Sequence, residues 1–269
     1  MLQSFLTESE VAISQKLLED GYVISPVDNL PGLNEIRKMI VELACHHLKI
    51  DYPSDPEHFL NHIHDLVTVE NLNSLRLAIF RGMNDLSWLR PTYFSLGRSN
   101  LFSLVGNELA MQNRVNPSIQ LPMDNSSLLD IHSDIFSGET PFQVVQWLPL
   151  VSVSGKKSMF ILSPEKSKAV VKNLKDIGDM PSVYEVVQQD LKWLDIPYGH
   201  VLIFDSSCLH GNVVNDSLES RWSLNCRFTG LFTPYTSYEK KLGSFYLPIT
   251  TRAATKIGIR YVEPGGFKE

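Results

Sequence analysis

The residues best suited to chemistry form an H-x-D motif, His132-Ser133-Asp134, in a segment expected to be extended. Successive side chains of a strand point to opposite faces, so His132 and Asp134 are expected on one face. An imidazole nitrogen and a carboxylate oxygen placed in this way can bind two neighbouring positions of an octahedral divalent ion. A second imidazole would complete a facial triad and leave three positions open. Alone, the motif is weak evidence, because it also occurs at polar strand ends and turns.

A second set of residues lies downstream. The run 199–205 reads as a turn that feeds a hydrophobic strand, and His210 follows it as the candidate third ligand. Arg221 and Ser223 are spaced to share one strand face. A planar guanidinium beside a hydroxyl group suits a carboxylate ligand. Each residue also has an ordinary explanation, since 221–228 alternates polar and apolar residues like a half-solvated strand. The H-x-D motif, a distal His beside a Gly and the R-x-S pair are much less likely to occur together by chance than any one of them alone.

Together these motifs resemble the Fe(II)/2-oxoglutarate-dependent oxygenases and, within them, the phytanoyl-CoA hydroxylase-like branch. The resemblance covers roughly residues 117–229, and its matching residues are His132, Asp134, Gly199, Phe204, His210, Gly211, Asn215 and Arg221. Arg221-Trp222-Ser223 is similar to the R-x-S pair that holds the distal carboxylate of 2-oxoglutarate in some members. One departure is His200, where an Asp often follows the turn glycine.

The resemblance implies a mechanism and a set of roles. His132, Asp134 and His210 would bind Fe(II), while Arg221 and Ser223 would hold 2-oxoglutarate. The family uses O₂ and decarboxylates 2-oxoglutarate to succinate and CO₂. Asp134 favours hydroxylation over halogenation, because halogenating relatives replace this carboxylate with a small residue. Desaturation, epimerisation and ring formation remain open.

The expected substrate is a small polar metabolite or a carbohydrate-related biosynthetic intermediate. Asn225 and Arg227 share the predicted face of Arg221, and Gln146 and Trp147 lie on a strand soon after the H-x-D motif. These four residues are therefore candidate substrate contacts. The H-x-D motif, followed by segments 138–142 and 147–150, also resembles members linked to carbohydrate or surface-polysaccharide biosynthesis.

Two other classes of protein fit parts of the pattern. A cupin-like metal enzyme could use similar ligands without 2-oxoglutarate, but it would not need Arg221 and Ser223. A non-catalytic jelly-roll carbohydrate-binding module could stack sugars on Trp147 or Trp193. Binding of Fe(II) and release of succinate would separate these alternatives.

The elements that position these residues can also be predicted. Thr7-Glu8-Ser9-Glu10 fits a capping box before a helix that ends at Gly21, and 22–26 reads as a strand. The pattern is mostly helical from 55 to about 111, with breaks expected at Pro91 and near Gly97. Strand-like runs lie at 119–121, 142–150, 158–162, 201–204 and 222–228. Segments 164–175 and 183–194 read as helical excursions. This pattern predicts a mainly β fold with flanking helices, whose core is a double-stranded β-helix (jelly roll).

One domain is expected over residues 1–269. Its parts would be a mostly helical support or lid (about 1–113), a jelly-roll core with the metal site (about 114–235) and a C-terminal extension (236–269). Part of the region before Asn113 is expected to cover the iron, because oxygenases must exclude water and stray reductants from the oxidant.

Composition limits the partners of the chain. Its 269 residues are 43% hydrophobic and 20% charged, with a net charge of −6, which argues against a large nucleic-acid-binding surface. The three cysteines, Cys45, Cys208 and Cys226, are too widely spaced for a zinc knuckle and do not indicate a disulfide framework. No signal peptide or membrane span is evident in the sequence. We expect a cytoplasmic protein that binds a small-molecule substrate, and the sequence does not indicate its oligomeric state.

Overall fold

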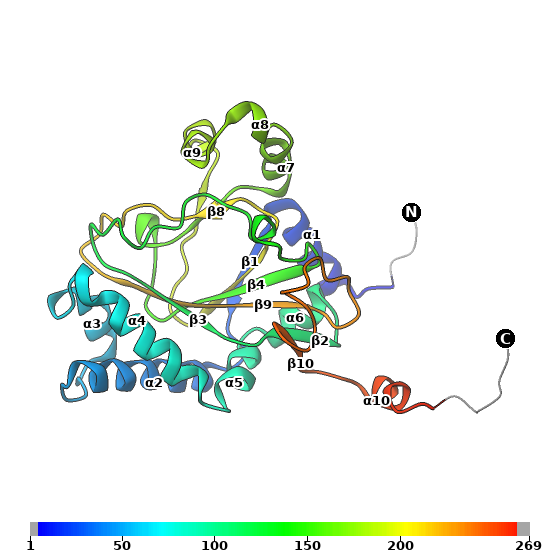
Figure 1. The fold of residues 1–269 in the computed structure, drawn as a ribbon, viewed down its shortest axis with the longest axis horizontal. Coiled ribbons are helices and arrows are strands. Elements are labelled where there is room, and N and C mark those ends of the chain that lie inside the picture. Colours follow the sequence, from blue (N-terminus) through cyan, green and yellow to red (C-terminus); the bar gives the residue numbers. More distant parts are fainter. Residues whose placement is uncertain (1–4, 263–269) are drawn as a thin grey trace.

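The computed structural model describes residues 5–262 and contains two antiparallel sheets (Figure 1). The larger sheet has the order β1-β7-β4-β9-β2-β10, with β3 also paired to β9, and the smaller has the order β6-β5-β8. The strands are β1 (Tyr22–Pro26), β2 (Leu109–Gln112), β3 (Asn116–Gln120), β4 (Gln143–Pro149), β5 (Phe160–Ile161), β6 (Lys192–Trp193), β7 (His200–Asp205), β8 (His210–Gly211), β9 (Arg221–Gly230) and β10 (Tyr246–Pro248).

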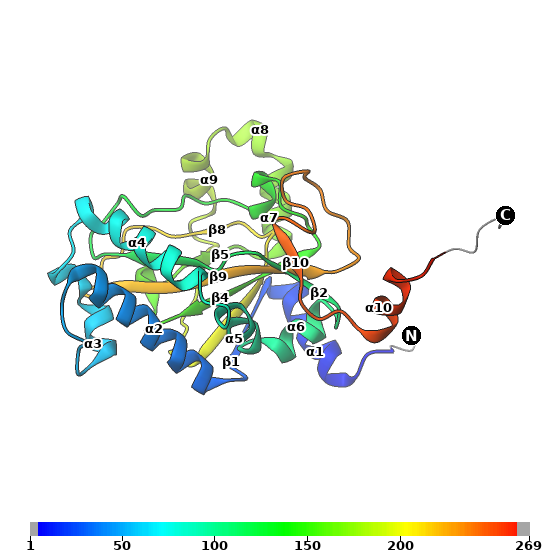
Figure 2. The same cartoon turned by 60° about the horizontal axis from the view of Figure 1, so that its bottom comes forward.

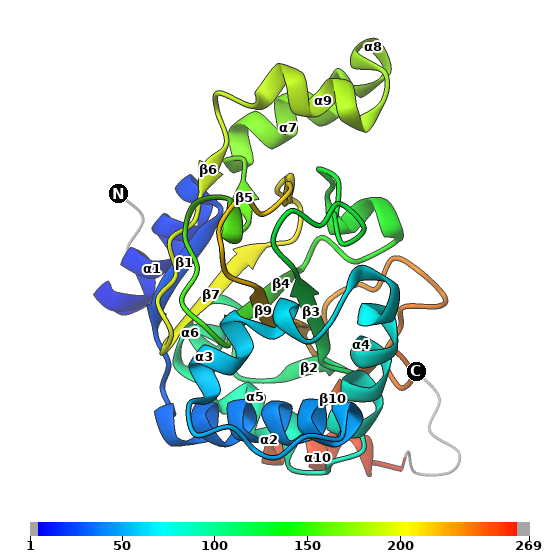
Figure 3. The ribbon, with the colours of Figure 1, turned by 90° about the vertical axis from the view of Figure 1, so that its left-hand side faces the viewer.

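Helices flank both sheets. The α-helices are α1 (Glu8–Asp20), α2 (Leu30–Leu48), α3 (Pro56–Asn61), α4 (Val69–Asn84), α5 (Leu89–Ser95), α6 (Arg98–Leu104), α7 (Pro164–Lys172), α8 (Leu174–Ile177), α9 (Met180–Val187) and α10 (Ala253–Ile259). Three 3₁₀ helices are η1 (Ile63–Asp65), η2 (Asp134–Ser137) and η3 (Gly155–Lys157). Helices α2 to α5 lie on one side of the larger sheet, and α7 to α9 project on the opposite side (Figure 3). This architecture agrees with the predicted mainly β fold with flanking helices.

The N-terminal elements form as predicted. The Thr7 hydroxyl accepts a hydrogen bond from the Glu10 amide, and the Glu10 carboxylate accepts one from the Thr7 amide. Gly21 ends α1 with φ 83°, a left-handed conformation that glycine adopts without steric cost. The chain then enters β1, which pairs with β7.

Strand alternation separates the two faces of the larger sheet. In β9, Trp222, Leu224, Cys226 and Phe228 belong to the main hydrophobic core, which also includes the buried residues of α2. The Tyr93 hydroxyl of α5 donates to the carbonyls of Gln146 and Leu224, at 2.8 and 3.3 Å, and so joins the helical layer to β4 and β9. The polar residues of β9 consequently point to the other face of the sheet.

Three expectations about elements need correction. Residues 109–112, expected at the end of a helical block, form β2, which pairs with β9 and β10 because all four residues are buried in the sheet. Pro91 does not interrupt a helix: it lies in the first turn of α5, where a missing amide hydrogen costs no helical bond. The C-terminal β10 and α10 are additional elements, and α10 lies away from the sheets (Figure 2). None of the helices within residues 5–262 has the length and apolar character needed to span a bilayer.

Candidate metal centre

Three candidate ligands meet at one point of the structure. One potential ligand atom from each of His132, Asp134 and His210 lies within 4.8 Å of the others. His132 and His210 form an isolated antiparallel bridge, with both amide-to-carbonyl distances at 2.9 Å. The expectation that the H-x-D motif lies on a strand is wrong, because Asp134 begins the 3₁₀ helix η2. The bridge to β8 rather than strand periodicity brings the three residues together.

A glycine permits this close approach of the two segments. A Cβ atom at Gly211 would lie 2.8 Å from the Leu129 carbonyl oxygen and 3.2 Å from that of Asp130. Those contacts are too short for a side chain, so β8 can pair beside residues 129–132 only with glycine at this position. The Gly that follows the candidate third ligand therefore has a structural cause.

Both histidines present the same nitrogen to the centre. His132 Nδ1 lies 2.6 Å from the Asp130 carbonyl oxygen, and His210 Nδ1 lies 2.9 Å from that of Cys208. A carbonyl oxygen can only accept, so each Nδ1 carries the hydrogen and each Nε2 keeps a free lone pair. Backbone contacts of this kind orient imidazole ligands in metal sites.

The surroundings of His210 and Asp134 favour the forms of these two candidate ligands that bind metals. Burial lowers the pKa of His210 to about 4, so that the imidazole is neutral near pH 7. Burial opposes ionisation of Asp134, which is 4% exposed, but the charge and hydrogen bonds of Arg227 together with the two neighbouring histidines outweigh it and lower the pKa of the carboxyl group below its ordinary value. Arg227 holds both carboxylate oxygens, from Nη2 to Oδ1 at 2.8 Å and from Nε to Oδ2 at 3.0 Å.

The triad opens into a cavity of about 90 Å³ between the two sheets. On this measure one water needs roughly 10–15 Å³, so the cavity has room for a small ligand. Its lining residues are Ser118, Leu129, His132, Asp134, Val145, Trp147, Met159, Phe204, His210, Gly211, Asn212, Arg221, Asn225 and Arg227.

Arg221 carries a buried charge that has no carboxylate partner among residues 5–262. The residue is 4% exposed, and its guanidinium donates to the Ser158 carbonyl at 3.1 Å and to the Ser118 hydroxyl at 3.4 Å. Its Nε has no partner. Burial lowers the Arg221 pKa to about 10, which leaves the group charged at neutral pH. An isolated buried charge is costly unless an anion compensates it.

Further unpartnered polar atoms surround this guanidinium. The strand register pairs Gln120 with Arg221 and Ser118 with Ser223. Buried atoms without a hydrogen-bond partner include Ser223 Oγ, Ser158 Oγ, Gln120 Oε1 and Asn212 Nδ2. Most of these atoms can donate hydrogen bonds. The residues present therefore fit a divalent metal ion at the triad and a carboxylate ligand beside Arg221.

The predicted substrate residues divide between the faces of the sheet. Trp147 and Asn225 line the cavity. Gln146 does not: its amide donates to the Tyr93 carbonyl at 2.8 Å on the helix-packed face. The expectation for Gln146 is corrected for a geometric reason, since adjacent residues of a strand cannot share a face. Arg227 lines the cavity, but Asp134 already occupies its guanidinium.

None of the described residues before Asn113 lines the cavity. Every lining residue comes from 118–227, and helices α2 to α5 lie against the opposite face of the larger sheet. Its apolar side chains cover the sheet instead. The assignment of a support or lid role to this region stays a prediction.

Sequence reasoning missed three polar residues near the centre. Asn212 follows His210 at the two-residue spacing of a shared strand face, which was an available signal. Ser118 contacts Arg221 across paired strands. Glu139 lies 3.5 Å from Arg227 Nε and is 1% exposed. No local pattern in the sequence marks the last two.

Comparison with known proteins establishes the fold of the chain. No protein-family model matches it, and no curated protein does. Among solved structures, the non-heme monooxygenase ThoJ, in its apo form, has 13% sequence identity and a TM-score of 0.59, with 89% of this chain and 84% of that chain covered. The non-heme alpha ketoglutarate dependent carbocyclase SnoK from nogalamycin biosynthesis has 14% identity and a TM-score of 0.55, with 91% and 97% covered. HygX from Streptomyces hygroscopicus, with nickel and 2-oxoglutarate bound, has 13% identity and a TM-score of 0.51, with 86% and 89% covered.

Proposed function

We propose that this protein is a non-haem Fe(II)- and 2-oxoglutarate-dependent oxygenase that hydroxylates a small polar molecule. His132, Asp134 and His210 would hold the iron, and Arg221 would hold the distal carboxylate of 2-oxoglutarate. When bound together, these groups supply O₂-dependent oxidation of a substrate C–H bond, with 2-oxoglutarate converted to succinate and CO₂. The order of residues from His132 to Arg221 also supports the phytanoyl-CoA hydroxylase-like branch.

One observation carries the proposal: a metal-binding triad and a buried, unpaired arginine line the same cavity. The triad leaves coordination positions free, because three candidate protein ligands meet there among residues 5–262. Arg221 calls for an anion in the same space. A keto acid that chelates the metal at one end and carries a carboxylate at the other satisfies both requirements. The fold shared with ThoJ, SnoK and HygX is consistent with this function.

The residues beside the triad support hydroxylation of a polar substrate. Asp134 occupies the position that halogenating relatives leave to a halide. Trp147 and Asn225 line the cavity and offer a stacking surface and an amide. These features favour a small polar metabolite or a carbohydrate-related intermediate.

Ligand titration tests the proposal. We would load the protein with Ni(II), which is redox-inert here, and measure the binding of 2-oxoglutarate and of glutarate. Glutarate has both carboxylates but lacks the 2-oxo group that completes the chelate. We expect 2-oxoglutarate to bind more tightly than glutarate with Ni(II), and the two to bind alike without it. Equal binding in the presence of Ni(II) would count against the chelate.

Turnover separates the proposed function from its alternatives. With Fe(II), O₂ and 2-oxoglutarate, we expect slow release of succinate even without substrate, and faster release with the right substrate. A cupin-like enzyme would bind the metal without forming succinate. A carbohydrate-binding module would bind sugars in the absence of any metal.

A further inference from the structure

The loop that follows Asp134 is held by a segment from the C-terminal part of the chain. We call residues 234–246 the strap; they follow β9 and end at the start of β10. Apart from the contacts of Glu139, three side-chain hydrogen bonds join the strap to residues 137–140: Thr140 Oγ1 to the Pro234 carbonyl (2.7 Å), Thr236 Oγ1 to the Gly138 carbonyl (3.1 Å) and Lys240 Nζ to Ser137 Oγ (3.2 Å). The strap thus fixes the segment in which Asp134 is the first residue of a 3₁₀ turn.

Glu139 is the point at which the strap meets charged groups inside the protein. This carboxylate is 1% exposed and accepts from Lys240 Nζ at 2.8 Å and from the Tyr246 hydroxyl at 2.7 Å. On its inner side it lies 3.5 Å from Arg227 Nε. A buried carboxylate with these partners is held in one position, because loss of any partner leaves charge uncompensated.

Arg227 connects Glu139 to the metal centre. Its guanidinium binds both oxygens of Asp134 and so fixes the rotation of that carboxylate. The result is a chain of alternating charges, Lys240–Glu139–Arg227–Asp134, that runs from the strap to a candidate metal ligand. Oxygen Oδ1 of Asp134 also lies 3.9 Å from His132 Nε2, so the fixed carboxylate keeps one oxygen toward the imidazoles.

We propose that the strap sets the metal affinity of the centre, with Glu139 and Arg227 as positioning residues that transmit its position to Asp134. This inference rests on the proposed metal site. Coupling of this kind is reciprocal, so metal binding must stabilise the strap to the same extent that the strap favours metal binding.

Paired lysine variants test the coupling. Lys240 binds Glu139, whereas the neighbouring Lys241 places its ammonium 3.6 Å from the centre of the Tyr238 ring. Lys240→Met and Lys241→Met therefore remove the same charge from adjacent positions. Removal of a nearby positive charge would by itself strengthen the binding of a cation. We expect the opposite for Lys240→Met, because Glu139 loses its partner in the strap, and predict that Ni(II) binding weakens by roughly 2- to 30-fold. Lys241→Met should bind Ni(II) like the natural protein.

Variants of Arg227 and Glu139 test whether these two residues transmit the position of the strap to Asp134. Arg227→Lys keeps the charge but loses the two-pronged contact, and we expect about a 10- to 100-fold loss of metal affinity. Glu139→Gln keeps the shape of the side chain and should give a smaller loss. Co(II) absorption spectra should change in both variants, because reorientation of Asp134 alters the ligand field, and circular dichroism checks that each variant is folded.

Hydrogen exchange gives a readout that needs no turnover. We expect amides of residues 234–246 to exchange more slowly when Ni(II) is added to the natural protein, and expect Glu139→Gln to lose this protection. Equal Ni(II) affinity in Lys240→Met and Lys241→Met, with unchanged exchange in the strap, would overturn the coupling while leaving the metal site intact. Failure of the natural protein to bind Ni(II) would instead overturn the proposed function.

Discussion

At the residue scale, Arg221 most restricts what the cavity can hold. Its charge is buried, no carboxylate within residues 5–262 pairs with it, and Ser118 and Ser158 supply only neutral partners. A metabolite with a free carboxylate would stabilise this arrangement. Ser223 shares the strand face of Arg221, and its hydroxyl is buried without a partner, although it does not line the cavity itself. The two residues predicted as an anchor pair thus differ in access to a ligand.

We predict that Arg221→Ala weakens binding of 2-oxoglutarate to the Ni(II)-loaded protein. A hydrogen bond to a charged group contributes about 1.5–3 kcal/mol, which corresponds to roughly 10- to 100-fold in affinity. Arg221→Lys should lose less, because it keeps the charge without the planar pair of donors. Ser223→Ala should lose least. Ni(II) content measured on each variant would show whether the metal site is intact, and normal 2-oxoglutarate affinity in Arg221→Ala would remove this residue from the anchor role.

A second prediction at this scale concerns the third ligand. His210→Ala should abolish the tight binding of one Ni(II) or Co(II) ion, because the two remaining ligands, His132 and Asp134, are too few to hold the ion tightly. His200→Ala is the matched control, since His200 begins β7 and does not line the cavity. Calorimetric titration would give the stoichiometry and affinity for both. Retention of one tight site in His210→Ala would show that other residues bind the ion.

At the scale of elements, β9 organises the molecule because its two faces have different tasks. Apolar residues of β9 pack against the helical layer, while Arg221, Asn225 and Arg227 face the cavity. The alternation was predicted, but a half-solvated strand and the wall of an internal cavity have the same pattern. The second sheet decides between them, because it covers the polar face. Helices α2 to α5 cover the apolar face of the larger sheet, and Arg76 of α4 also donates to the Ile119 carbonyl and to the Ser127 hydroxyl.

The contact between the helical layer and the sheet gives a prediction for stability. Tyr93→Phe removes the hydroxyl that bridges β4 and β9, and we expect the free energy of unfolding to fall by about 0.5–1.5 kcal/mol. The affinity for Ni(II) should change little, because Tyr93 lies on the face away from the triad. Tyr198→Phe is the control: its hydroxyl donates to Asn34 at an exposed position, so it should cost less. Urea unfolding of both variants would measure the difference, and equal losses would contradict the bridging role.

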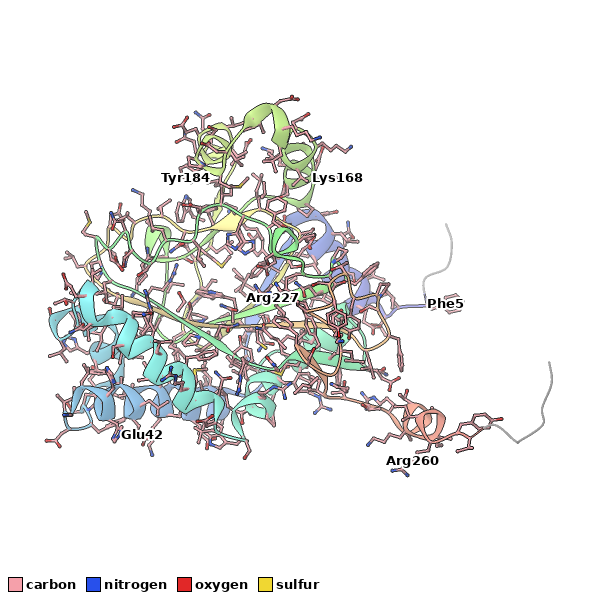
Figure 4. The ribbon with its side chains drawn as sticks, in the orientation of Figure 1. Phe5, Glu42, Lys168, Tyr184, Arg227 and Arg260 are labelled. Atoms are coloured by element: carbon pink, nitrogen blue, oxygen red, sulfur yellow. The ribbon has the colours of Figure 1, made fainter. Side chains whose placement is uncertain are left out.

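At the scale of the whole molecule, the metal centre joins segments that lie far apart in the chain. His132 lies outside the named strands and forms a bridge with His210 of β8. Arg227 of β9 reaches Asp134 from the larger sheet. The ion therefore binds only when both sheets are assembled. In Figure 4, Arg227 lies inside the body of the protein, while Arg260, which follows α10, lies outside it. Metal binding should consequently stabilise the entire fold rather than one element.

We predict that Ni(II) or Co(II) raises the unfolding temperature and that a chelator reverses the effect. A ligand at 100 times its dissociation constant stabilises the native state by about 2.7 kcal/mol. For a chain of this size, that corresponds to a rise on the order of 5–10 °C. Addition of 2-oxoglutarate should raise the temperature further only when metal is present. An equal rise in His210→Ala would indicate that the ion binds outside the triad.

The sequence by itself determined the local structure and the chemical types of the site. The capping box at Thr7 and the left-handed Gly21 fix α1 through contacts between near neighbours. Strand periodicity assigns the polar and apolar faces of 221–228 for the same reason. The candidate ligands could be named because imidazole and carboxylate groups are common metal ligands and because their spacing in the sequence resembles a known motif. The structure then brings His132, Asp134 and His210 to one point.

Only the tertiary structure decided how those groups are used. Gln146 and Trp147 are equally plausible in sequence, but β4 turns one to Tyr93 and the other to the cavity. Arg227 lies 93 residues from Asp134, and Lys240 lies 101 residues from Glu139, so no local pattern could pair them. The N-terminal helices pack on the larger sheet because that sheet has an apolar face to bury. The physical reason is common to all three cases: long-range packing selects one partner among many of the same type, and that selection depends on the whole chain.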